Sequence, residues 1–308
     1  MKIIRTPEGK ANLNIWRDGE EYLNQKGPIL LKEWTNVLYS TLPQPKDSPI
    51  YYIDLSKRGL DCPENTFDAV NCYHIFEHFS PRQGDMAIQE LKRVLNPGGI
   101  LRISVPDMER NCREYLKYFE ASLKEPSRKN LLCYQWTVME IFEQMVRDKP
   151  GGLMYEYLKK GEYDQQYMDE FYSDVFGPIM RAAKNEKDKK VTEEKSSPHR
   201  SSAQRLAHGL RWRWQVLSSK IARQLGRKHS GALPPRESKE AVRWMYDRIS
   251  LRLFFEKNGF TQVIQKTFKD SDIPHWDRYD LDRSNVADRE IDPSVYMEGR
   301  KVGLTDAA

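Results

Sequence analysis

Three residues able to do chemistry stand together in the stretch His74-Ile75-Phe76-Glu77-His78. An imidazole can take up a proton near neutral pH, and two histidines with a carboxylate can also bind a metal ion. The spacing HxxEH matches a class of zinc peptidases that carries both histidines on one long helix. Here a strand pattern leads into His74, and Phe79-Ser80-Pro81 follows His78 at once. We therefore expect no metal at this site.

Asp107 is a second candidate, because it follows the apolar run 100–105 after a single proline. If residues 67–75 and 100–105 are neighbouring parallel strands, His74 and Asp107 stand at adjacent strand ends. Two structural alternatives stay open. Asp107 can cap a helix that begins at Met108, and Glu77 with His78 can satisfy backbone groups at the start of the next helix.

The elements that must position these residues alternate along the chain. Short apolar runs predict strands at 10–16, 51–55, 67–75 and 100–105, and the 3–4 spacing of Met86, Ile88, Leu91, Val94 and Leu95 predicts a helix over 83–96. Residues 30–39 fit helix and strand equally. Further helices are expected over 107–147, 152–176, 203–225 and 237–258, and two closing strands, antiparallel to each other, over 260–268 and 295–302. Alternating strands and helices indicate a mostly parallel α/β sheet covered on both faces.

The composition is that of a water-soluble globular protein. Hydrophobic residues make up 39% of the 308 and charged residues 31%, and no apolar run approaches the ~18 residues that a membrane span needs. The first five residues do not resemble the start of a signal peptide. The four cysteines, Cys62, Cys72, Cys112 and Cys133, form no CxxC pair, so we expect reduced thiols and a cytoplasmic protein.

The stretch from Phe67 to Asp107 resembles the class I S-adenosylmethionine-dependent methyltransferases, and in particular their sugar and surface-polysaccharide group. The matching pieces are Phe67-Asp68-Ala69-Val70, His74 with Glu77-His78, Glu90 to Leu95, Pro97-Gly98-Gly99 and Val105-Pro106-Asp107. A second match near the C-terminus consists of Arg243 to Asp247, Leu251 to Phe260, Ser271 to Pro274 and Ser294 to Gly299. The resemblance implies a Rossmann-like methyltransferase fold, with a mostly parallel sheet, a closing antiparallel strand and a helical insertion.

The resemblance also implies a domain plan and a site. The methyltransferase-like domain would comprise residues 1–150 and 236–308, interrupted by a helical, basic insertion at 151–235. S-adenosylmethionine would be the cofactor and a sugar or lipid-linked glycan the substrate, in polysaccharide biosynthesis. Methyl transfer to a hydroxyl needs a base, for which His74 is the candidate, and Asp107 would orient His74 or the sugar. The cofactor side would be formed by Asn14, Trp16, Asp18, Asp54, Leu55 and Tyr73.

The sequence departs from the family pattern on the cofactor side. Trp16 and Asp18 stand where the family has glycines that let the backbone approach the cofactor. Leu38 stands where the family has a carboxylate for the ribose hydroxyls, whereas Asp54 fits the acid on the adenine side. Asp18, Glu20 or Glu21 could supply the missing cofactor contact. An alternative is therefore a protein of this fold that has lost S-adenosylmethionine binding and serves as a scaffold or partner subunit, or binds another ligand.

A basic segment follows the middle of the chain. Residues 181–231 contain fourteen Lys or Arg and four Asp or Glu, a net charge of +10 against +5 for the whole chain, so the remainder carries −5. Within it, apolar residues at helical spacing run from Leu206 to Leu225. Such a helix suits an anionic membrane surface, so we expect peripheral contact at the inner membrane through residues 203–228. Packing on the domain or a second subunit of a homo-oligomer, or on a pathway partner protein, is the alternative, and nucleic acid is disfavoured because no binding module accompanies the patch.

Overall fold

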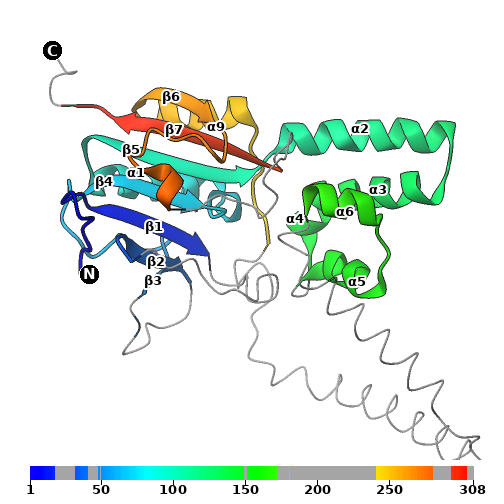
Figure 1. Ribbon diagram of the computed structural model, residues 1–308, viewed down its shortest axis with the longest axis horizontal. Helices are drawn as coiled ribbons and strands as arrows, with labels where there is room; N and C mark the ends of the chain where they lie inside the picture. The colour runs from blue at the N-terminus through cyan, green and yellow to red at the C-terminus, as the bar shows by residue number, and fades with distance from the viewer. Residues whose placement is uncertain are drawn as a thin grey trace, which may run out of the picture.

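The protein is built around one seven-stranded sheet in the order β3-β2-β1-β4-β5-β7-β6 (Figure 1). The computed structural model describes residues 1–17, 32–40, 48, 50–148, 151–172, 180, 241–279 and 293–303. The strands are β1 (Asn12–Arg17), β2 (Thr35–Tyr39), β3 (Tyr51–Ile53), β4 (Phe67–Tyr73), β5 (Leu95–Pro106), β6 (Phe260–Lys266) and β7 (Ser294–Lys301). The first five are parallel, and β7 runs antiparallel to both β5 and β6. The predicted parallel sheet with an antiparallel closing strand is confirmed.

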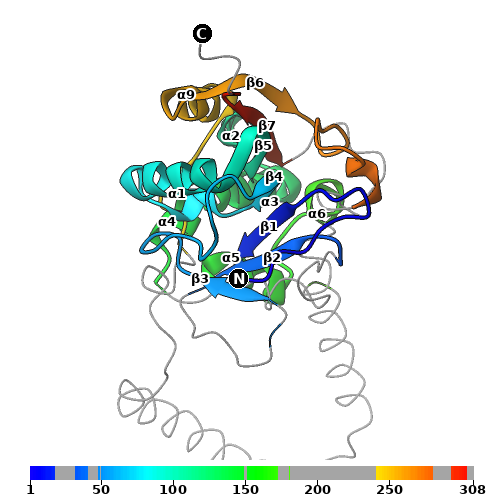
Figure 2. The same ribbon diagram turned by 90° about the vertical axis from the view of Figure 1, so that its left-hand side faces the viewer.

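One face of the sheet carries the main apolar core. Inward residues of the strands, such as Leu13, Val70 and Ile103, pack with side chains of α1 (Pro81–Val94) and α9 (Arg248–Lys257). Both helices lie on the same side of the sheet (Figure 2). Helix α1 begins where a capping box between Ser80 and Gln83 satisfies its first amides, with Pro81 in the first turn.

Four predictions about the elements need correction. The stretch expected to be helical over 152–176 contains two helices, α5 (Gly152–Lys160) and α6 (Gln165–Phe171), because Gly161 ends the first in a left-handed conformation. Residues 241–247 are not helical, because the amides of Val242, Arg243 and Trp244 bond to carbonyl groups of other segments, and α9 starts at Arg248 behind the cap of Asp247. The helix expected over 107–147 is interrupted at 125–127. Met86 is half exposed and lies off the buried stripe of α1. The ambiguous stretch 30–39 contains strand β2, and residues 203–225 lie outside the described part of the chain.

The second face of the sheet is crossed by a row of buried polar side chains. In register order across the strands they are Asn36, Asn14, Asn71, Arg102 and Glu298. Asn71 Nδ2 donates to Asn14 Oδ1 at 3.0 Å, and Asn36 Nδ2 donates to the Trp34 carbonyl at 2.9 Å. Because side chains on alternate residues share a face, this row fixes which face of each strand turns toward the apolar core.

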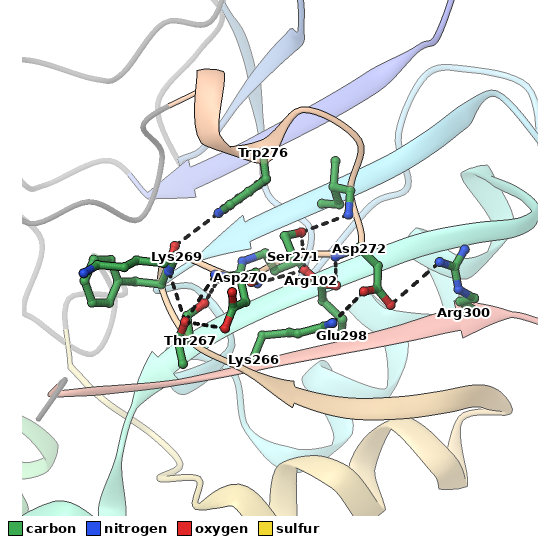
Figure 3. A network of polar contacts seen from close by, with 12 residues as sticks. Arg102, Lys266, Thr267, Lys269, Asp270, Ser271, Asp272, Trp276, Glu298 and Arg300 are labelled. Atoms are coloured by element: carbon green, nitrogen blue, oxygen red, sulfur yellow. Dashed lines mark hydrogen bonds and ion pairs between the residues drawn. The ribbon is translucent and has the colours of Figure 1, made fainter. Parts of the chain in front are cut away.

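Arg102 and Glu298 of this row belong to a wider network of polar contacts (Figure 3). The guanidinium of Arg102 is fully buried, forms an ion pair with Glu298 at 2.8 Å, and donates to the carbonyl groups of Thr267 and Asp270 at 2.8 and 3.0 Å. It also lies over the ring of Trp276, 4.5 Å from the centroid. Glu298 in turn accepts from the Asp272 amide at 2.8 Å. The pair therefore joins β5 and β7 to the loop after β6.

A second body of helices lies beyond the carboxyl ends of the strands (Figure 1). It consists of α2 (Met108–Lys124), α3 (Arg128–Val138), a π-helical turn (Met139–Glu143), α4 (Gln144–Val146), α5 (Gly152–Lys160) and α6 (Gln165–Phe171). These helices share a core of their own that includes Cys133, Trp136, Leu158, Met168 and Phe171. The domain boundaries expected at 150 and 235 stay predictions, since residues 149–150 and 181–240 are outside the described part.

A buried ion pair also holds this helical body together. The π-helical turn points Glu140 into the interior, 3.3 Å from the guanidinium of Arg110 on α2. Arg110 donates to Tyr172 OH at 2.7 Å and lies over the ring of Phe171. Burial raises the pKa of Glu140 to about 7, although Arg110 opposes the shift.

Over the described ranges, no helix is both long and apolar enough to cross a membrane.

We expect Arg102→Met to lower the free energy of unfolding by about 3–5 kcal/mol, because it leaves the Glu298 carboxylate buried without its partner charge. The matched control is Arg252→Met, which removes an Arg–Glu contact of 3.0 Å from the solvent-exposed surface of α9. That change should cost about 1 kcal/mol or less. Urea unfolding of both variants gives the comparison, and equal losses would contradict a stabilising role for the Arg102 pair.

Candidate active site

His74 follows β4 in a backbone conformation that is rare for a residue with a side chain. Its φ is +50°, and its amide donates to the Ser104 carbonyl of β5 at 3.0 Å. A non-glycine residue with positive φ is strained, and such strain is often found at functional sites. The turn takes the chain out of the sheet and into a short 3-10 helix, Phe76–His78.

The His74 ring is held between two partners. Nδ1 lies 3.2 Å from Glu77 Oε1, and Nε2 lies 3.0 Å from Ser294 Oγ, at the start of β7 (Figure 1). An ionised carboxylate can only accept hydrogen bonds, so Nδ1 carries the proton of the neutral ring. The lone pair of Nε2 therefore faces the Ser294 hydroxyl. About a quarter of the His74 side chain (24%) is exposed, which leaves the ring open to a substrate.

Glu77 is the buried member of this group, with only 4% of its side chain exposed. Burial by itself raises the pKa of Glu77, but the hydrogen bond with His74, the neighbouring imidazole of His78 and a backbone hydrogen bond outweigh burial, so the pKa lies below its ordinary value. Glu77 also ties down the segment after residue 240, because its carbonyl accepts from the amides of Arg243 and Trp244 at 2.7 and 3.1 Å. His78 Nδ1 lies 3.3 Å from the Ala241 carbonyl. Glu77 and His78 do not cap α1, whose start Ser80 satisfies.

Asp107 stands at the adjacent strand end, as expected, but its carboxylate caps a helix. Oδ1 accepts from the Glu109 amide at 2.9 Å and caps α2. Burial raises the pKa of Asp107. Within the described residues its carboxylate makes no contact with His74, so the orienting place that we expected Asp107 to fill is taken by Glu77. A role toward substrate stays a prediction.

The residues expected to hold a cofactor lie in different parts of the fold and do not form one cluster among the described residues. Asn14 is buried in the polar row of the second face, Leu55 is buried in the main core, and Tyr73 packs beside the His74 ring with centroids 4.5 Å apart. Asp54 closes its own turn, because its Oδ1 accepts from the Ser56 amide at 3.1 Å. Asp18 lies outside the described residues.

Trp16 lies at the carboxyl end of β1 beside Leu38 of β2, its partner in register. The two side chains form an apolar cluster with Ile50, against which Tyr52 packs. S-adenosylmethionine would need a close backbone approach after β1 and a carboxylate after β2. Trp16 and Leu38, at the described ends of β1 and β2, supply neither a glycine nor a carboxylate. Asp18, Glu20 and Glu21 lie outside the described part of the chain.

Ser294 was missed as a site residue, although it lies in the C-terminal stretch that resembles the family. Its partner His74 is 220 positions away in the sequence, so local patterns could not pair them. For Glu77 the sequence indicates the HxxEH spacing, the family resemblance and a structural alternative, but not its contact with His74. No cluster of three or more potential metal ligands is found among the residues that the structure describes.

Comparison with known proteins gives a match for part of the sheet. Residues 36–103, which run from β2 into β5, match the family model described as a methyltransferase domain. The chain has a Rossmann-like methyltransferase fold. A search of curated proteins gives no match.

Solved structures that resemble the chain include two methyltransferases and a cyclase. The CurJ carbon methyltransferase is 7% identical, with a TM-score of 0.35 over 97% of this chain and 50% of its own. A SAM-dependent methyltransferase from Thermotoga maritima is 12% identical, with a TM-score of 0.31 over 82% of this chain and 63% of its own. The [4+2]-cyclase SpnF is 22% identical, with a TM-score of 0.21 over 30% of this chain and 38% of its own. The chain thus spans between 38% and 63% of the length of these structures.

We expect Glu77→Gln to lower the free energy of unfolding at neutral pH by about 1.5–3 kcal/mol, the range for a hydrogen bond to a charged group. The folded pKa of Glu77 is below its ordinary 4.5, so its stabilisation is fully present above about pH 4.5 and is lost as the pH falls through the folded pKa. Urea unfolding between about pH 7 and about pH 3 should show the wild type and the variant converging at the acid end. Glu256→Gln, on the surface of α9, is the control and should show no such convergence. A difference that grows toward acid would contradict the assignment.

Proposed function

We propose that this protein transfers a methyl group from S-adenosylmethionine to a hydroxyl group of a sugar, in the synthesis of a surface polysaccharide. The observation that carries the proposal is the lone pair of His74 Nε2, presented at the carboxyl ends of β4 and β5, where ligands bind in parallel sheets. The match of residues 36–103 to the methyltransferase domain supports it, as does the resemblance of residues 67–107 and 243–299 to the sugar group.

In this proposal His74 removes the proton of the acceptor hydroxyl. Glu77 holds the ring with Nδ1 protonated and stabilises the positive charge that the imidazole gains. The Ser294 hydroxyl forms a hydrogen bond with His74 Nε2, and the acceptor hydroxyl would replace it there. Tyr73 packs on the His74 ring and restricts its rotation.

A second candidate is a protein of the same fold that does not bind S-adenosylmethionine. The apolar cluster of Trp16, Leu38 and Ile50 favours it, because these side chains stand where the donor would need backbone and a carboxylate. Such a protein would still bind a hydroxyl compound at His74 and would serve as a partner subunit or act on another ligand.

Calorimetric titration of the full chain with S-adenosylhomocysteine separates the two candidates. If the proposal holds, the ligand gives a saturable heat, and Asp54→Asn weakens binding about tenfold, equivalent to about 1.4 kcal/mol. Asp61→Asn, which changes a fully exposed carboxylate nearby in the sequence, is the control and should bind as the wild type does.

Absence of heat at high micromolar ligand would overturn the proposal. If Trp16→Gly then gained binding, the second candidate would be supported directly, because removal of the indole would have opened the donor side.

We also propose that the acceptor is presented at the inner membrane surface, as a lipid-linked glycan, through the basic segment 203–228. The support is its sequence: regularly spaced apolar residues beside a local excess of positive charge. We expect the full chain to sediment with anionic phospholipid vesicles and a variant lacking residues 201–230 to stay in solution. Sedimentation should weaken with added salt, because surface charges are screened. Unchanged sedimentation after the deletion would contradict the proposal.

A further inference from the structure

Ser294, His74 and Glu77 form a hydroxyl–imidazole–carboxylate array at the edge of the sheet. We propose that this array makes Ser294 a nucleophile toward carboxylic esters, an activity separate from methyl transfer. The inference rests on the positions of these three side chains and does not depend on S-adenosylmethionine.

The geometry supplies both contacts that such an array needs. Ser294 Oγ lies 3.0 Å from His74 Nε2, and His74 Nδ1 lies 3.2 Å from Glu77 Oε1. A nucleophile within hydrogen-bond reach of a base, and a base held by a third group, define the arrangement that activates a hydroxyl. The same constellation recurs on unrelated folds, so it is recognised by geometry and not by sequence position.

The fold brings the three residues together from distant places. Strand β5 lies between β4 and β7, and Ser294 pairs with Pro106 at the end of β5. His74 follows the pairing of Tyr73 with Ser104, adopts a left-handed backbone, and its ring reaches across the last residues of β5 to Ser294. Ser294 is thereby fixed to the sheet, and Glu77 lies in the short 3-10 helix that follows β4.

The carboxylate is placed to stabilise a charged imidazole. Glu77 is buried, its Oε1 also lies 3.8 Å from His78 Nε2, and its Oε2 has no hydrogen-bond partner among the described residues. A buried carboxylate with so few donors gains much when a positive charge develops on the adjoining ring. That is the charge that appears when His74 accepts the proton of Ser294.

The reaction has two balanced halves. Ser294 Oγ bonds to the ester carbonyl carbon as its proton passes to His74 Nε2, and the carbonyl carbon then releases the alcohol oxygen, which takes that proton. The acyl group is now an ester of Ser294. A water molecule repeats the sequence, giving its proton to His74, which returns it to Ser294 Oγ as the acid leaves. No oxidant, reductant or further reactant is needed.

Esters with a good leaving group are the substrates of choice, because they demand least stabilisation of the intermediate oxyanion. The probe is p-nitrophenyl acetate with the full chain. We expect an initial burst of p-nitrophenolate and one acetyl group on the peptide that contains Ser294. Ser294→Ala should abolish both, His74→Gln should slow acylation by about 10²–10⁴-fold, and Ser122→Ala, a serine on α2 far from the array in sequence, should leave both unchanged.

Glu77 acts through His74, so its variant needs a readout that loss of structure would not produce. In Glu77→Gln the burst should slow and the acid limb of its pH profile should move to lower pH, because the charged imidazole is less stabilised. A slower burst with an unmoved profile would make Glu77 merely structural. Nitrogen-15 spectra of the wild type should show neutral His74 protonated on Nδ1, and protonation on Nε2 would overturn the inference.

Two further results, the site of acetylation and the burst of Ser294→Ala, test the proposal. Acetylation of His74 or of lysines in place of Ser294, or an undiminished burst in Ser294→Ala, would overturn the proposal. The calorimetric titration with S-adenosylhomocysteine is independent of this result, so failure of one proposal does not imply failure of the other.

Discussion

The buried pair of Arg102 and Glu298 fixes the register between β5 and β7. That register sets which residues stand at the edge of the sheet where the parallel strands end. Glu298 and Ser294 lie four residues apart on β7, so they face the same side of the sheet. A slip of one residue would turn Glu298 away from Arg102 and would turn Ser294 away from His74 at the same time. The ion pair at the centre of the second face therefore determines, at a distance, which group stands beside the base.

The edge itself divides into two chemically different halves. Around β4, β5 and β7 it is polar, with a base, a buried carboxylate and a hydroxyl in hydrogen-bond contact. Around β1 and β2 it is apolar, with Trp16 and Leu38 packed on Ile50. The residues that could activate a hydroxyl are thus assembled on one half, while the half expected to hold the cofactor is closed by side chains in the part that is described. The proposed methyl transfer and the proposed ester cleavage use the polar half and differ in which hydroxyl gives up its proton.

Local periodicity was enough to predict the sheet, because a parallel sheet buried on both faces leaves short apolar runs between helices. It was enough to place His74 and Asp107 at neighbouring strand ends, whereas Trp16 stood out only through the resemblance to the family. Local periodicity failed where partners are far apart in sequence. The contact of His74 with Ser294, the row from Asn36 to Glu298, and the extended path of residues 241–247 all depend on strand order, which no local pattern contains.

Asp107 stands at the strand end beside His74, and both its amide and its carboxylate make structural contacts. Its amide donates to the Pro293 carbonyl, and the next amide, that of Met108, donates to the Tyr246 carbonyl, so three chain segments meet where β5 ends. Its carboxylate caps α2, the helix that carries Arg110 into the second core. Removing such a cap costs about 1 kcal/mol, and protonating it would weaken the same contact. The carboxylate of Asp107 anchors the helical body, whereas that of Glu77 holds the His74 ring. In the proposed reactions these two tasks fall on different acids, Glu77 in the 3-10 helix after β4 and Asp107 at the start of α2.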